Sequence, residues 1–172
     1  MRLVAATPEM IRAEIDDHAH LSELLGAEIP ADWPPELIRD ALPWFLEQLE
    51  ARAENFGWMA WYGIAEDETV SQPSLVTSGG YTGPPVDGSA EIGYSASPSF
   101  YLRGYTGEMM AALVRRAFEH TDVSQLVADV REENTPSLRL LARLGFRMQG
   151  PALEPEHLHF ILEKGNWIDK PD

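Results

Sequence analysis

The fold is decided by the stretch Glu91-Ile-Gly-Tyr-Ser-Ala-Ser-Pro-Ser-Phe-Tyr-Leu-Arg-Gly-Tyr-Thr-Gly-Glu108. An apolar run opens it, a loop with Gly104 and Gly107 follows, and a helical pattern of apolar residues continues beyond Glu108. A strand that passes through a glycine loop into a helix directs unpaired backbone N–H groups and the positive end of the helix dipole toward one point. Phosphate oxygens bind well at such a point, and Arg103 in the loop adds a charged contact. The stretch therefore indicates a phosphate cradle, and the alternative is an ordinary strand–loop–helix corner.

The glycine spacing of this loop differs from two common nucleotide-binding motifs. It is not the GxxxxGK[ST] of nucleoside-triphosphate loops. It is also not a GxGxxG that follows the first strand of a fold. We therefore do not expect a nucleoside-triphosphate loop here.

A second strand and helix follow further along the chain. Leu126–Arg131 alternates between apolar and polar residues, as a strand does. Asn134-Thr-Pro-Ser137 then predicts the start of a helix, with Thr135 as its N-cap and Pro136 at its first position. Leucines at every third position give this helix a buried stripe, and Gly145 ends it.

These segments resemble the GNAT acyl-CoA N-acetyltransferases. The resemblance is carried by EIGYSASPSFYLRGYTGE (Glu91–Glu108), VREENTPSLRLLARLGF (Val130–Phe146) and SGGYTGPP (Ser78–Pro85). It runs from about Trp58 to Phe146, and it is strongest to the branch that includes the ribosomal-protein alanine acetyltransferases. The motifs are specific for the fold and the cofactor, and they do not specify the acceptor.

The resemblance implies an α/β (α+β) fold whose mixed, mostly antiparallel central sheet is flanked by helices. Two parallel strands, Ile92–Ala96 and Leu126–Arg131, are expected to splay apart and to hold the pantetheine arm of acetyl-CoA between them. A chain of 172 residues is long enough for a full core. We therefore expect one acyl-CoA N-acetyltransferase domain over residues 1–172.

The resemblance also places the acetyl-CoA contacts. The pyrophosphate is expected at the loop made by Leu102, Arg103, Gly104, Tyr105, Thr106 and Gly107. Backbone groups at Ser95 and Ala96 would face the thioester oxygen, and Asn134 would reach the pantetheine amides. The family loop usually reads Gln/Arg-x-x-Gly-x-Gly/Ala, whereas this chain has Tyr101 at the first position and Thr106 at the last. The β-branched Thr106 narrows the space for close approach, which Gly107 is able to restore.

Two residues are predicted to move protons in the reaction. Glu91 matches the glutamate of histone-type GNAT members that deprotonates the acceptor through water, and a base in an apolar cleft should have a raised pKa. The tyrosine that often protonates the leaving thiolate aligns with Leu141, so Ser137 is the candidate for that role. The alternatives are a solvated strand-end carboxylate for Glu91 and a local helix cap for Ser137. Asp129 is a weaker candidate base, which we expect to pair with Arg131.

The predicted activity is direct transfer of an acetyl group from acetyl-CoA to a primary amine in a ternary complex. The acceptor is left open between a protein N-terminus and a small amine. The rival hypothesis is a GNAT-like module that binds acyl-CoA without catalysis, as a sensor or a partner subunit. Tyr101, Thr106 and Leu141 are the departures from the family pattern that support the rival hypothesis.

Composition and charge limit the other classes of function. The chain has no cysteine, which excludes disulfides, thiolate metal sites and an acetyl-cysteine intermediate, and no metal is expected. A formal net charge of −15 argues against nucleic-acid binding and favours a cationic acceptor. The sequence lacks an apolar run of membrane-spanning length and a signal-peptide pattern, so we expect no membrane partner and a cytoplasmic location. A homodimer and a monomer both remain open.

The first third of the chain predicts helices around a proline-rich connection. Thr7-Pro8-Glu9 is expected to start a helix, and Pro43 is expected to bend or split a second one over Glu36–Glu54. The resemblance assigns this region to the acceptor site, with Trp33, Trp44 and Phe45 as candidate contacts. Later in the chain, residues 149–156 are expected to form an irregular link before a last strand over Leu158–Leu162.

Overall fold

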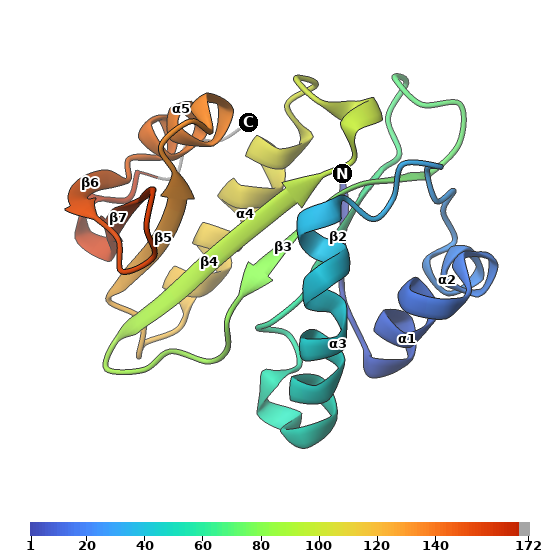
Figure 1. Ribbon diagram of the computed structural model, residues 1–172, viewed down its shortest axis with the longest axis horizontal. Helices are drawn as coiled ribbons and strands as arrows, with labels where there is room; N and C mark the ends of the chain where they lie inside the picture. Colours follow the sequence, from blue (N-terminus) through green and yellow to red (C-terminus); the bar gives the residue numbers. More distant parts are fainter. Residues whose placement is uncertain (169–172) are drawn as a thin grey trace. The chain divides into compact units, whose positions relative to one another are not determined.

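The helices and strands follow one another in an order that alternates only in part. In chain order they are β1 (Arg2–Ala5), α1 (Pro8–Asp16), α2 (His18–Leu25), α3 (Glu36–Ala51), η1 (Ala53–Asn55), β2 (Trp61–Ala65), β3 (Ser74–Tyr81), β4 (Ser89–Ala96), η2 (Pro98–Phe100), α4 (Tyr105–Glu119), β5 (Gln125–Arg131), α5 (Thr135–Leu144), β6 (Arg147–Pro151), β7 (His157–Glu163) and η3 (Lys164–Asn166). This computed structural model describes residues 1–168, apart from the side chain of Leu37. Figure 1 shows the ribbon.

The chain divides into two units. The first comprises Met1–Pro84 and Tyr94–Met110, and the second comprises Pro85–Gly93 and the chain from Ala111 onward. The strand β4 and the helix α4 each contribute one part to either unit.

In the first unit, strands β1, β2, β3 and β4 are neighbours in that order. β2 pairs antiparallel with both β1 and β3, with a bulge between Gly63 and Ile64. Successive residues of a strand point to opposite faces of the sheet, and β3 follows this rule. Leu75 joins a core with the apolar side chains of α1, α2 and α3, whereas Val76 packs with Tyr105 at the start of α4.

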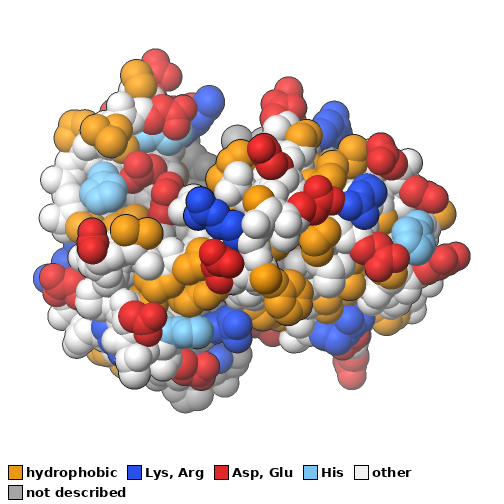
Figure 2. Space-filling model, turned by 90° about the horizontal axis from the view of Figure 1, so that it is seen from below, with side chains coloured by type: hydrophobic (Ala, Val, Ile, Leu, Met, Phe, Trp, Pro, Cys, Tyr) orange, Lys and Arg blue, Asp and Glu red, His pale blue; other side chains and the backbone are white. Residues whose placement is uncertain are grey.

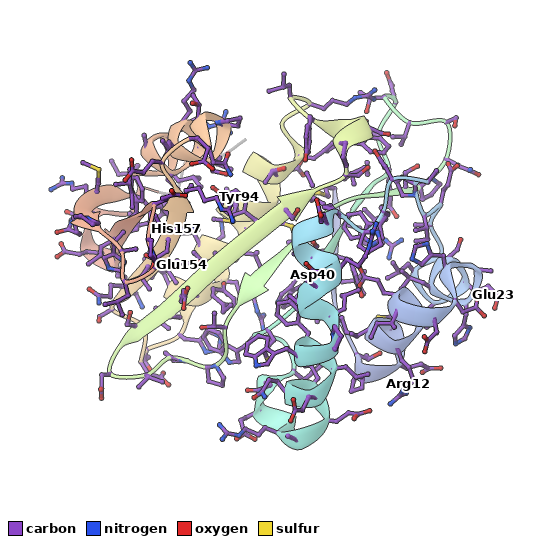
Figure 3. All side chains as sticks on the ribbon, viewed as in Figure 1. Arg12, Glu23, Asp40, Tyr94, Glu154 and His157 are labelled. Carbon is purple, nitrogen blue, oxygen red and sulfur yellow. The ribbon has the colours of Figure 1, made fainter. Side chains whose placement is uncertain are left out.

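Local signals account for the helices of this unit. The hydroxyl of Thr7 accepts a hydrogen bond from the Met10 N–H at 3.2 Å, which confirms the predicted start of α1. Asp17 caps α2, and Gly26 ends it in the left-handed conformation at φ +59°. Pro43 was expected to bend or split α3. It lies inside the helix without ending it, so the helix is not split. The guanidinium of Arg12 on α1, labelled in Figure 3, donates to Glu50 of α3.

In the second unit, the strands are neighbours in the order β4, β5, β7, β6. The start of β4 runs parallel to β5, with Glu91 in register with Val127, whereas β7 pairs antiparallel with β5 and β6. The core of this unit is made of buried residues from its strands, from the second part of α4 and from α5. Its members include Leu113, Val114, Leu126, Ala128, Leu141 and Leu162.

The predicted fold class is confirmed, since the sheet is mixed and mostly antiparallel with one parallel pair and has helices around it. Two expectations about single elements are wrong. The strand predicted from Trp58 begins at Trp61, because Trp58 and Met59 donate their N–H groups to Asn55 in a turn. The irregular link predicted from residue 149 contains the end of the edge strand β6.

Candidate functional site

The predicted phosphate loop lies in the first unit, between the 3₁₀ turn η2 and the helix α4. Leu102 has φ +62° and Gly104 has φ +89°, so two residues close together adopt left-handed backbone conformations. A leucine rarely adopts this conformation, and such strain is found preferentially at functional sites. The Leu102 side chain is also 96% exposed, so packing of this side chain does not account for the conformation. Turns with left-handed residues converge backbone N–H groups into anion-binding concavities.

The first turn of α4 adds further donors to this loop. The helix begins at Tyr105, two residues before the predicted end of the loop at Gly107. The Glu108 N–H donates to the Gly104 carbonyl at 3.1 Å, so the N–H groups of Tyr105, Thr106 and Gly107 precede the first bond of the helix ladder. A Cβ atom built on Gly104 would meet nothing within 4 Å, which leaves this side of the loop open to a ligand.

Arg103 is the cation of the loop, and an aromatic ring holds it. Its guanidinium carbon lies 5.2 Å from the centroid of the Phe100 ring. The Phe100 ring in turn packs edge-on against Tyr105, with the centroids 6.2 Å apart. Since Arg103 is exposed, its charge remains available to an anion next to the donors of α4.

The Tyr105 side chain is buried in the core of the first unit. It is 5% exposed, and its hydroxyl hydrogen-bonds to Thr69 and lies 3.2 Å from Oδ1 of Asp67. Tyr105 can therefore offer a ligand its backbone N–H group only. Thr106 is partly exposed, whereas Gly107 is buried.

The end of β4 leads through η2 into this loop. Ser95 and Ala96 are both partly buried there, and the Ser95 carbonyl accepts a hydrogen bond from the Thr77 hydroxyl at 2.6 Å. The residues of the first unit that are predicted to contact acetyl-CoA therefore lie on one continuous segment. Tyr94, labelled in Figure 3, begins the part of β4 that belongs to this unit.

The other predicted residues lie in the second unit. Glu91 is exposed on β4, in parallel register with Val127. Asp129 is exposed on the neighbouring strand, but it does not pair with Arg131 as predicted. Its Oδ1 lies 2.6 Å from Nδ1 of His159 on β7, because these two residues stand directly opposite each other in the antiparallel pair.

Asn134 and Ser137 are joined at the start of α5. The Oδ1 atom of Asn134 accepts the Ser137 N–H at 3.2 Å, so Asn134 is the N-cap. The predicted N-cap, Thr135, is instead the first helical residue. Leu141, at the position of the family tyrosine, is fully buried and therefore faces the interior of its unit. Ser137 is partly exposed.

A buried carboxyl group in the first unit was not predicted from the sequence. Glu14 on α1 is 2% exposed, and its two oxygens accept hydrogen bonds from Trp33 Nε1 at 2.7 Å and from the Tyr62 hydroxyl at 2.5 Å. Burial raises the pKa of Glu14 to about 7, although both hydrogen bonds act to lower it. Trp33, a predicted acceptor contact, is thus a core residue at 2% exposure, whereas Trp44 is 43% exposed.

The surface charge is dispersed on the face shown in Figure 2. Basic side chains lie singly among acidic ones there and do not gather into one patch. In the second unit, Nε2 of His157 lies 3.9 Å from a carboxylate oxygen of Glu154, and Figure 3 labels both residues. Within residues 1–168, the helices are too short or too polar to cross a membrane.

The comparisons with known proteins agree on one family. The profile of the Acetyltransferase (GNAT) domain matches residues 10–147. The uncharacterised N-acetyltransferase YjdG of Bacillus subtilis is 28% identical over 155 residues, which cover 90% of this chain and 89% of that protein.

Solved structures share the fold at low identity. The ribosomal-protein-S5-alanine acetyltransferase of Vibrio fischeri matches with a TM-score of 0.62 at 16% identity, over 98% of this chain and 94% of that one. The N-acetyltransferase PseH of Campylobacter jejuni, solved with acetyl coenzyme A, matches with a TM-score of 0.57 at 16% identity, over 94% and 99% of the two chains. The family profile covers most of the chain, and the chain therefore belongs to the GNAT family of acetyltransferases.

Proposed function

We propose that this acetyltransferase moves the acetyl group of acetyl-CoA directly to a primary amine, with both substrates bound together. The observation that carries the proposal is the loop of the first unit, where left-handed Leu102 and Gly104 precede the open N-terminus of α4. Such a loop suits the pyrophosphate of CoA, and Arg103 supplies a positive charge beside it. The family match at residues 10–147 runs through both units, which supports one acetyltransferase domain over the whole chain.

The proposed reaction requires two proton transfers. The amine nitrogen attacks the thioester carbonyl carbon, the C–S bond breaks, and the thiolate takes up a proton. Glu91 accepts the amine proton through a water molecule, and its exposure on β4 supports this route because water reaches the carboxylate. Ser137 donates to the thiolate. The residue type at position 141 supports this assignment, because the family position for the acid holds a leucine here and carries no hydroxyl.

Backbone and amide groups complete the donor site in this proposal. The segment at Ser95 and Ala96 faces the thioester oxygen. Asn134 reaches the pantetheine amides with its Nδ2 group, because its Oδ1 already caps α5. The N–H groups of residues 102–107 hold the pyrophosphate.

The acceptor in this proposal is a cationic amine, either a protein N-terminus or a small molecule. The net charge of −15 favours the approach of cations over long distances. The Vibrio fischeri protein of the same fold is named for an alanine on a ribosomal protein, which makes a protein N-terminus one candidate. The absence of cysteine supports direct transfer without an acetyl-cysteine intermediate.

Titration of CoA by calorimetry tests the donor loop. Gly104→Pro removes an N–H group and imposes a φ near −65°, so the affinity for CoA should fall by about tenfold or more. Gly104→Ala is the matched control, because it keeps the N–H group and its Cβ has open space. The strained φ should make its loss smaller than that of the proline variant.

The outcomes separate the alternatives. Equal CoA affinity in wild type and Gly104→Pro would place the cofactor elsewhere, and a wild-type protein that binds no CoA would refute the proposal. Thiol release from acetyl-CoA is then measured with a panel of peptides and small amines. Turnover with any of them excludes a module that binds acyl-CoA without catalysis.

A further inference from the structure

One carboxylate outside the predicted site accepts hydrogen bonds from the residues that precede the donor loop. Asp32 lies in the connection between α2 and α3, and its side chain accepts three hydrogen bonds. The Ser97 hydroxyl donates to Oδ1 at 2.5 Å, whereas the Ser99 N–H and hydroxyl donate to Oδ2 at 2.8 and 2.7 Å. These residues are more than 60 positions apart in the sequence, and all of them belong to the first unit.

The two serines define the turn η2. Ser97 is fully buried, and its own N–H donates to the Val76 carbonyl at 3.1 Å, so it is fixed to β3. The Ser99 N–H belongs to the first residues of η2, where a helix leaves its N–H groups without internal partners. Asp32 therefore caps this turn from a distant part of the chain. Hydrogen bonds to an ionised group are about twice as strong as neutral ones.

The turn in turn fixes the cation of the loop. Phe100 is the last residue of η2, and its ring carries the Arg103 guanidinium at 5.2 Å and contacts Tyr105 at the start of α4. A displacement of η2 would therefore move the surface on which Arg103 rests. Partial burial acts to raise the pKa of Asp32, but the hydrogen bonds from Ser97 and Ser99 outweigh it and hold the pKa below its ordinary value.

We propose that Asp32 is a positioning residue for the donor loop, which fixes η2 and, through Phe100, orients Arg103 toward the pyrophosphate of CoA. The inference rests on the proposed function of this loop. It also links two parts of the reaction, because the connection that carries Asp32 is the segment that the family resemblance assigns to the acceptor. Asp32 contributes no contact to CoA in this scheme.

Hydrogen exchange of the free protein tests the positioning without any ligand. In Asp32→Ala, amides in peptides covering residues 97–107 should exchange about tenfold faster, whereas peptides from β5 should be unchanged. Glu36→Ala is the matched control, because it removes an exposed acidic side chain from a residue near the same connection. Asp32→Asn keeps one acceptor oxygen and should give an intermediate rate. Unchanged exchange in both Asp32 variants would overturn the inference.

Calorimetric titration with CoA tests the link to Arg103. Asp32→Ala should weaken CoA binding by about tenfold, and the loss should shrink to about twofold in an Arg103→Ala background. A full tenfold loss in that background would show that Asp32 does not act through Arg103. If Asp32→Ala does not fold, Ser99→Ala is the milder variant. It removes one of the three donors, the Ser99 hydroxyl, and leaves the Ser97 hydroxyl and the Ser99 N–H on Asp32, and it should show the same coupling.

The two proposals fail in different ways. A wild-type protein that binds no CoA refutes the proposed function, whereas the exchange rates still decide whether Asp32 holds η2. If wild type, Asp32→Ala and Asp32→Asn all bind CoA with the same affinity, the proposed function stands. The positioning role of Asp32 is then refuted.

Discussion

Two glutamates, one in each unit, lie in opposite environments: Glu14 is buried and Glu91 is exposed. Glu14 is 2% exposed, both of its oxygens accept hydrogen bonds, and burial raises its pKa to about 7. Glu91 is exposed on the strand face of the second unit. A raised pKa is the property expected of a general base, yet the buried carboxyl that has it is enclosed among Trp33 and Tyr62.

A perturbed pKa and access to a substrate are separate requirements for a general base. Desolvation shifts the pKa of a carboxyl group, but the same enclosure keeps an amine away from it. We therefore interpret Glu14 as a structural carboxyl that holds Trp33 and β2 to α1. Glu91 remains the proposed base because water reaches it.

The largest expected difference between the two glutamates is in stability. At pH 5.5, where Glu14 is mostly protonated, Glu14→Ala should lower the free energy of unfolding by about 3–5 kcal/mol. The substitution leaves the Trp33 N–H and the Tyr62 hydroxyl buried without an acceptor and creates a cavity. Glu91→Ala is the control and should change it by less than about 1 kcal/mol. Urea denaturation measures both, and equal losses would remove the distinction.

The next effect is a dependence of stability on pH. The folded protein holds the Glu14 proton up to a pKa of about 7, whereas the ordinary value is 4.5. Between these values the unfolded chain has released a proton that the folded protein keeps. The stabilisation is thus complete below pH 4.5 and is lost as the pH rises through 7, by about 2–3 kcal/mol between pH 5 and 8.

Glu14→Gln should remove this dependence. Its amide oxygen can accept from Trp33 and its NH2 group can donate to the Tyr62 hydroxyl oxygen without a charge. Denaturation at pH 5 and pH 8 should then show a smaller difference than in wild type, by about 2–3 kcal/mol. A slope unchanged by Glu14→Gln would assign the dependence to another group.

Local patterns predicted most of the fold, because strands, helix starts and glycine ends are encoded by neighbours in the sequence. The helix over Thr135–Leu144 ends at Gly145 as predicted, but it starts one residue earlier than predicted, with Asn134 as its cap, since two good capping residues stand side by side there. The strand β6 was missed because an edge strand tolerates Gly150, Pro151 and exposed polar residues.

Contacts between distant parts of the chain could not be predicted. The hydrogen bonds from Ser97 and Ser99 to Asp32 depend on how the connection after α2 passes η2, and no local pattern records this path. Glutamates on helices are usually exposed, so the burial of Glu14 could not be predicted from its residue type. The predicted acetyl-CoA contacts between Ser95 and Gly107 lie on one segment, because a strand–loop–helix unit is continuous in sequence, whereas the predicted contact Asn134 lies at the start of α5 in the second unit.

The smallest expected effect concerns the base itself. Glu91→Gln keeps the size of the side chain and removes its basicity, so kcat/KM should fall about tenfold at pH 6–7, or about 1.4 kcal/mol. The loss should shrink toward pH 9–10, because amines with pKa values of roughly 8–10 then release their own proton. CoA affinity, measured by calorimetry, should not change.

Asp129→Asn is the matched control on the neighbouring strand, where the carboxylate already pairs with His159, and it should leave the pH profile as in wild type. A loss in Glu91→Gln that is equal at every pH would mean that Glu91 only positions the acceptor. Full activity would remove it from the mechanism.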